Sequence, residues 1–133
     1  MQKRTHHVDR RTLLAGAAAG TVLGTLGAPS ILRAQAAAVK IGVLHPVTGA
    51  IAFSGNQGRQ GVLLAIEDIN RRGGIKSMGG ARVEAVLADA QSRPDVGAAE
   101  VDKLNEAGVA GIVGPFASGI ALATTQAAAR HNL

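Results

Sequence analysis

The apolar and polar positions along residues 39–75 change from the pattern of a strand to that of a helix. The run from Val39 to Leu44 is apolar on both faces, which is typical of a central strand in a parallel sheet. After a glycine-rich stretch, apolar residues recur at helical spacings of four and three; they are Val62, Ile66 and Ile69. Gly73 and Gly74 then supply the left-handed turn that ends a helix. This order predicts the first half of a β-α-β unit, whose binding loops follow the carboxyl ends of strands.

A second strand and helix are predicted after this unit. Along residues 81–88 apolar side chains alternate with polar ones, which favours a half-exposed edge strand. The apolar face of this strand comprises Val83, Ala85 and Leu87. Pro94 begins a helix that ends at Gly108. The buried face of this helix is predicted to hold Gly97, Val101 and Leu104.

The last part of the chain repeats the alternation once more. Residues 109–113 form a third apolar strand, which is cut at Gly114 and Pro115. A third helix is predicted from Ser118, with the serine as its cap, to about Arg130. The order β-α-β-α-β-α predicts an α/β fold, a doubly wound parallel sheet with helices on both faces.

The uneven distribution of charge separates residues 1–36 from the rest. Of the 14 lysines and arginines in the chain, five lie in this leader, and from Ala37 onward nine basic side chains face eight acidic ones. The leader carries the twin arginines Arg10 and Arg11, then an apolar run rich in alanine and glycine. This pattern predicts a Tat-type export signal that signal peptidase cleaves after about Ala36. The alternative is a membrane anchor that is not cleaved. The apolar run favours this alternative less, because its glycines make it less apolar than a membrane span.

The composition of residues 37–133, the predicted mature part, excludes several classes of function. The formal charge of +5 belongs mostly to the leader, and Phe53 and Phe116 are the only aromatic residues, so we expect no nucleic-acid binding. The chain has no cysteine, which excludes disulfides and thiol catalysis. Three glycines, Gly55, Gly58 and Gly61, give GxxGxxG and not the dinucleotide-binding GxGxxG. No P-loop, Ser-His-Asp or HExxH grouping occurs. We therefore predict no enzyme, no cofactor and no metal site.

Several segments of the chain resemble segments of one protein family, and they occur in the same order as in that family. They are IGVLHPVTG, FSGNQG, GVLLAIEDIN, RRGGI, ADAQSRPD and VAGIVGPFASG. Together they resemble the periplasmic substrate-binding proteins of branched-chain amino-acid-type ABC transporters, which have the type I periplasmic binding fold. The resemblance covers roughly Val39 to His131. Members typically have two lobes joined by a hinge, so it implies that residues 37–133 are part of the N-terminal lobe.

The resemblance implies a function and its partners. The expected protein is a periplasmic, solute-binding component of an ABC importer. It would capture a branched-chain amino acid or a similar amino-acid-like or amide solute and deliver it to the membrane permease, as a monomer when full length. The missing lobe would hold the amino group of the ligand, so residues 37–133 alone would bind at millimolar affinity or not at all. The alternative is an extracytoplasmic sensor domain of a receptor with the same fold.

The site is predicted on two loops at the carboxyl ends of strands. The loop after the third strand leads into a helix N-terminus, where free N–H groups and the Ser118 hydroxyl suit a carboxylate. The resemblance implies that Ser118, with its neighbours Ala117 and Gly119, contacts the α-carboxylate of the ligand. The first loop, Pro46 to Gly55, would place Phe53 or Ser54 against the ligand; Phe53 is an equally good candidate for a buried loop anchor.

Three further polar positions are predicted to be structural. Asp89 lies at the end of the second strand. We expect it to accept hydrogen bonds from backbone N–H groups of the following loop, in preference to contacting the ammonium group of a ligand. His45 is expected to be a hydrogen-bonded histidine and not a catalyst. Asp68 and Arg72 are expected to pair on a solvated helix face.

Overall fold

A parallel sheet in the order β2-β1-β3 forms the centre of residues 36–133, the part of the chain that the computed structural model describes. The strands are β1 (Val39–His45), β2 (Val83–Asp89) and β3 (Ile112–Val113). β1 is the middle strand and β2 lies at an edge, as the sequence predicts. The predicted export signal, with Arg10 and Arg11, lies outside the described residues apart from Ala36.

The pairing of the strands is long on one side of β1 and short on the other. β1 pairs with β2 along its whole length, from Val39 opposite Val83 to His45 opposite Asp89. The strand predicted over residues 109–113 is shorter than expected, because only Ile112 and Val113 form a ladder with β1. The backbone bonds that precede this ladder, from Ala110 N to Lys40 O and from Gly42 N to Gly111 O, still hold the chain beside β1.

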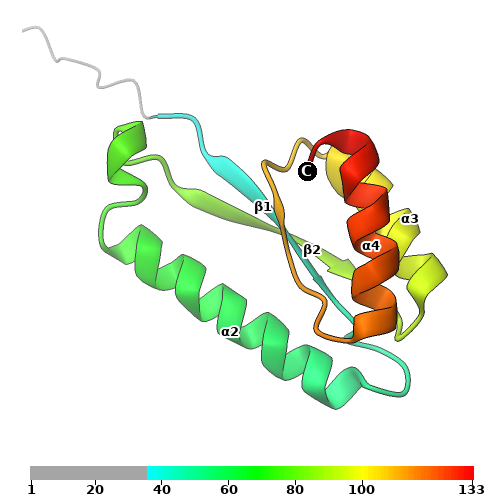
Figure 1. The fold of residues 1–133 in the computed structure, drawn as a ribbon. Coiled ribbons are helices and arrows are strands. Elements are labelled where there is room, and N and C mark those ends of the chain that lie inside the picture. Colours follow the sequence, from blue (N-terminus) through cyan, green and yellow to red (C-terminus); the bar gives the residue numbers. More distant parts are fainter. Residues whose placement is uncertain (1–35) are drawn as a thin grey trace, which may run out of the picture. The chain divides into compact units, whose positions relative to one another are not determined.

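Helices cover both faces of the sheet, which confirms the doubly wound fold. Helix α2 (Ala52–Arg71) lies on one face, and α3 (Pro94–Glu106) and α4 (Ser118–His131) lie together on the other (Figure 1). The short 3-10 helix η1 (Lys76–Met78) connects α2 to β2. None of the helices between residues 36 and 133 is long and apolar enough to cross a membrane.

The main core lies between the sheet and the α3–α4 pair. The predicted face of α3 is confirmed, since Gly97, Val101 and Leu104 are its buried residues. They pack with buried residues of β1, β2 and α4, among them Leu44, Ala88, Ile120 and Ala127. A Cβ at Gly97 would lie 2.9 Å from Ile120 Cγ2, so the glycine lets α3 and α4 approach closely.

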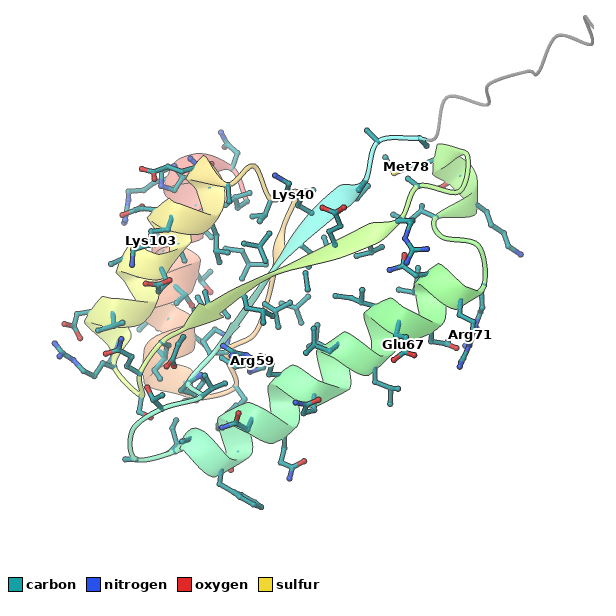
Figure 2. All side chains as sticks on the ribbon, turned by 180° about the vertical axis from the view of Figure 1, so that it is seen from behind. Lys40, Arg59, Glu67, Arg71, Met78 and Lys103 are labelled. Atoms are coloured by element: carbon teal, nitrogen blue, oxygen red, sulfur yellow. The ribbon has the colours of Figure 1, made fainter. Side chains whose placement is uncertain are left out.

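Helix α2 packs more loosely on the opposite face. Its predicted apolar residues, Val62, Ile66 and Ile69, line a groove of about 580 Å³ that the sheet also borders. The glycine stop is confirmed, with φ of 94° at Gly73 and 75° at Gly74. The predicted ion pair between Asp68 and Arg72 forms, and Asp68 also pairs with Arg71, which points away from the sheet (Figure 2).

The alternation predicted for β2 holds only in part. Val83 is buried, whereas Leu87 is 51% exposed although it belongs to the same face of the strand. Within the described residues β2 is an edge strand, so no neighbouring strand covers its outer side there.

Candidate functional site

Three loops meet at the edge of the sheet where the parallel strands end. They are residues 46–51 after β1, 90–93 after β2 and 114–117 after β3. The carboxyl ends of parallel strands are the usual place for a ligand in an open α/β sheet. Each of the three loops precedes a helix, so three helix N-termini lie at this edge (Figure 1).

Asp89 ties the first loop to the end of β2, which confirms the structural role predicted for it. Its Oδ1 accepts bonds from the backbone N–H groups of Val47 at 2.9 Å, Thr48 at 3.3 Å and Gln91 at 2.8 Å. Its Oδ2 accepts a bond from the Thr48 hydroxyl at 2.6 Å. Burial alone would raise the pKa of Asp89, but these hydrogen bonds outweigh it and hold the pKa below 3.8.

Replacing this carboxylate is expected to destabilise the fold at neutral pH. Asp89→Asn weakens or removes four charge-assisted bonds and should lower the free energy of unfolding by about 1 to 2 kcal/mol, since the group is partly exposed. Because the folded pKa is depressed, this stability is present above 3.8 and is lost as the pH falls through the folded pKa. Urea unfolding at several pH values should therefore show the wild type and the variant converging in acid.

Asp95→Asn is the matched control for this measurement. Asp95 is an exposed carboxylate that pairs with Arg93 on the surface, so its replacement should change little. Equal losses in the two variants would contradict the role assigned to Asp89.

Ser92 forms a second link between the first two loops, and its role was not predicted from the sequence. Its hydroxyl donates to Thr48 O at 2.7 Å and accepts from Ile51 N at 3.2 Å. Gly49 lies against it, since a Cβ there would be 2.7 Å from Ser92 Oγ. The only signal in the sequence was a serine in a polar turn, which is too common to single out.

Ser118 lies at the predicted place, but it does not cap its helix. It is the first residue of α4, the capping position belongs to Ala117, and no side chain bonds there. The expected cap is therefore wrong by one residue, because the backbone of Ala117 is the last extended one. Ser118 and Gly119 are exposed and Ala117 is half-buried, so the three residues of the predicted site are accessible together.

Phe53 and Ser54 lie in the first turn of α2 and not in a loop, because the helix begins at Ala52. Phe53 is 79% exposed, which rules out the alternative of a buried loop anchor. Phe116, in the loop before α4, is also 51% exposed. Both aromatic residues of the chain therefore belong to segments that follow the carboxyl ends of strands.

His45 is buried at the end of β1 without the hydrogen bonds expected of it. Its side chain is 5% exposed, and neither ring nitrogen has a partner among the described residues. Burial, followed by the nearby charge of Arg59, lowers the pKa of His45 below 6.5. Arg59 reaches from α2 toward the strands and donates to Ala88 O (Figure 2).

The described residues hold no cluster of three or more histidine or acidic side chains that could bind a metal ion. The edge instead offers hydroxyl groups, backbone N–H groups and two aromatic rings, which can bind a small polar molecule with an apolar part.

Comparison with known sequences identifies related proteins. The sequence profile of the periplasmic binding protein family matches residues 38–133. The Leu/Ile/Val-binding protein BraC3 of Rhizobium johnstonii is 33% identical over 95 residues, which are 71% of this chain and 25% of that protein. The leucine-, isoleucine-, valine-, threonine- and alanine-binding protein of Pseudomonas aeruginosa is 39% identical over 80 residues, 60% of this chain and 21% of that protein.

The fold is also similar to that of a solved structure. The branched-chain amino acid transporter substrate-binding protein LivJ of Streptococcus pneumoniae, in complex with isoleucine, matches with a TM-score of 0.68 and 30% identity. The match covers 72% of this chain and 27% of LivJ. The chain thus spans about a quarter of the length of the relatives that it matches.

Proposed function

This chain belongs to the periplasmic binding protein family, and we propose that it forms part of the extracytoplasmic solute-binding component of an ABC importer. The ligand is a branched-chain amino acid or a similar amino-acid-like or amide solute. The observation that carries the proposal is the exposed N-terminus of α4, where the Ser118 hydroxyl lies beside the N–H groups that precede the first helical bond. The names of the related binding proteins support the same class of ligand.

The start of α4 is suited to a carboxylate. The first bond of the helix runs from Ala121 N to Ala117 O, so the N–H groups of the three preceding residues lie outside the helical ladder. A helix N-terminus also carries a partial positive charge. A carboxylate oxygen held there can accept a bond from the Ser118 hydroxyl as well.

The apolar part of the ligand would contact aromatic side chains at the same edge. Phe53 begins α2 and Phe116 precedes α4, and both rings are largely exposed. A buried aliphatic side chain gains free energy roughly in proportion to the apolar surface removed from water. An amino acid with a branched aliphatic side chain fits such a site better than a strongly polar one.

Export and delivery are part of the same proposal. The twin arginines of residues 1–36 support Tat export with cleavage after about Ala36. Membership of the family supports a periplasmic location and a membrane ABC permease as partner. We propose a monomer for the full-length protein. The proteins compared are named binding or transporter components, so no observation favours the receptor domain.

Ser118→Ala tests the carboxylate contact. A hydrogen bond to a charged group contributes about 1.5 kcal/mol or more, so the variant should bind L-leucine about tenfold more weakly. The readout is the shift of the Ser118, Gly119 and Ile120 amide resonances as L-leucine is added to the chain. The matched control is Ser77→Ala, since Ser77 is an exposed serine of η1. L-leucinamide, which lacks the carboxylate, should leave the resonances unchanged; equal binding of both compounds would contradict the carboxylate contact at Ser118.

A further inference from the structure

The imidazole of His45 is enclosed by two glycines from different elements. A Cβ at Gly58, on α2, would lie 2.8 Å from the ring atom Cε1. A Cβ at Gly114, where β3 leads into the loop before α4, would lie 2.9 Å from Nε2. Both distances are shorter than real side-chain contacts, so the backbone at these positions lies directly against the ring. His45 is therefore in contact with the backbone of the loop that carries the candidate carboxylate site.

The surroundings of the ring favour its neutral form. On α2 the charged group that faces it is Arg59. On β2 the residue opposite in register is Asp89, but its carboxylate is occupied by the N–H groups of the first loop and the Thr48 hydroxyl. On the β3 side the neighbour is Gly114, which has no charge. The ring thus has a positive group beside it and no hydrogen-bond partner for either ring nitrogen among the described residues.

We propose that His45 is a positioning residue that makes the candidate site sensitive to pH. The neutral ring holds the loop from Gly114 to Ser118 against the end of β1, and protonation displaces this loop. The displacement moves Ser118 and weakens the binding of a carboxylate ligand at acid pH. Only this last step depends on the proposed function.

Among the segments that surround the His45 ring, the loop from Gly114 to Ser118 is the one that can move. A protonated ring carries two N–H donors, and burying them without acceptors is costly. β1 is fixed by its pairing with β2 along its whole length, and α2 is anchored at Gly55, which is tightly packed on Pro46. Residues Gly114 and Phe116 of the loop are exposed, so outward movement there uncovers the ring to water.

The direction of the pH effect follows from the lowered pKa of His45. The unfolded or displaced state binds the proton more readily than the closed state. The closed arrangement is therefore fully present above pH 6.5 and is lost as the pH falls through the lower pKa of the folded protein. Histidine is the side chain whose charge ordinarily changes in this pH range, so it is the usual pH switch in proteins.

An NMR titration of the full chain tests the proposal. The ring nitrogens of His45 and the amides of Phe116, Ser118 and Gly119 are followed from neutral to acid pH. We expect one common midpoint below 6.5 for the ring and the loop amides, and no such transition in His45→Gln. Loop amides that stay constant while the ring titrates would overturn the proposal, as would an unchanged loop transition in His45→Gln.

His131→Asn is the matched control variant. His131 lies at the end of α4, and its Nε2 is 2.7 Å from Asp102 Oδ1, on the outer side of the α3–α4 pair. Removing it should leave the transition of the loop amides in place. If the transition disappears in this variant, the loop responds to His131 and the assignment to His45 is wrong. The wild-type titration and this control decide the question even if His45→Gln does not fold.

Ligand binding is measured separately, so that the two proposals can fail independently. L-leucine should bind less well to the wild type below the midpoint than at neutral pH, whereas His45→Gln should show no such loss. Absence of L-leucine binding at every pH, tested up to tens of millimolar ligand, would contradict the carboxylate contact proposed at Ser118 in this chain, while the loop titration would still judge the role of His45.

Discussion

Gly55→Ala is expected to displace the start of α2 and to destabilise the fold strongly. An alanine Cβ at this buried position would lie 1.8 Å from Pro46 O and 2.5 Å from the carbonyl carbon of Pro46. These are backbone atoms of the residue that follows β1, so no side chain can rotate out of the way. Overpacking of this kind costs about 1 to 3 kcal/mol or more. Urea unfolding followed by circular dichroism should give a lower free energy of unfolding.

Gly61→Ala is the matched control, because it makes the same chemical change two turns later in the same helix. No atom lies within 4 Å of a Cβ placed there. Alanine forms helices better than glycine, so this variant should be more stable than the wild type by about 0.5 to 1 kcal/mol. Opposite signs for the two variants are the expected result. A loss of stability in both would mean that α2 does not tolerate alanine for a reason other than contact with Pro46.

The sequence predicts the elements of the fold well because their patterns are local. The apolar run of β1 reflects burial on both faces of a central strand, and the helical spacing in α3 reflects burial that repeats every three to four residues. The glycine stop at Gly73 and Gly74 has its own backbone signature. These features depend on near neighbours in the chain, so one sequence is enough to recognise them.

The candidate site could be predicted only in outline, because its contacts join distant parts of the chain. The role of Asp89 was foreseen from its place at the end of a strand, whereas the partners of Ser92 lie more than 40 residues away. The same reason explains the error at His45. Its expected hydrogen bonds depended on which residues the fold brings beside it, and these are Gly58 and Gly114, which offer no side chain.

Gly114→Ala is expected to lower the free energy of unfolding more than Gly55→Ala does, because it combines two separate penalties. The φ of Gly114 is 102°, a conformation that residues with a Cβ rarely adopt. The new Cβ would also lie 2.2 Å from Leu44 O and 2.9 Å from His45 Nε2. Backbone strain of about 1 to 3 kcal/mol and overlap of a similar size give a loss of about 2 to 6 kcal/mol in the free energy of unfolding.

The matched control for this change is Gly111→Ala, three residues earlier in the same segment. A Cβ at Gly111 meets no atom within 4 Å, and its φ is not positive, so this variant should unfold close to the wild type. Urea unfolding compares the two variants, and the amide resonances of Phe116 to Gly119 report the position of the loop.

Because Leu44 and His45 are fixed within β1, the alanine at position 114 can be accommodated only by moving the loop. We therefore expect its resonances to change even where the protein remains folded. A variant that keeps both its stability and these resonances would show that the loop is not held against β1, and would remove the geometric basis of the carboxylate site at Ser118.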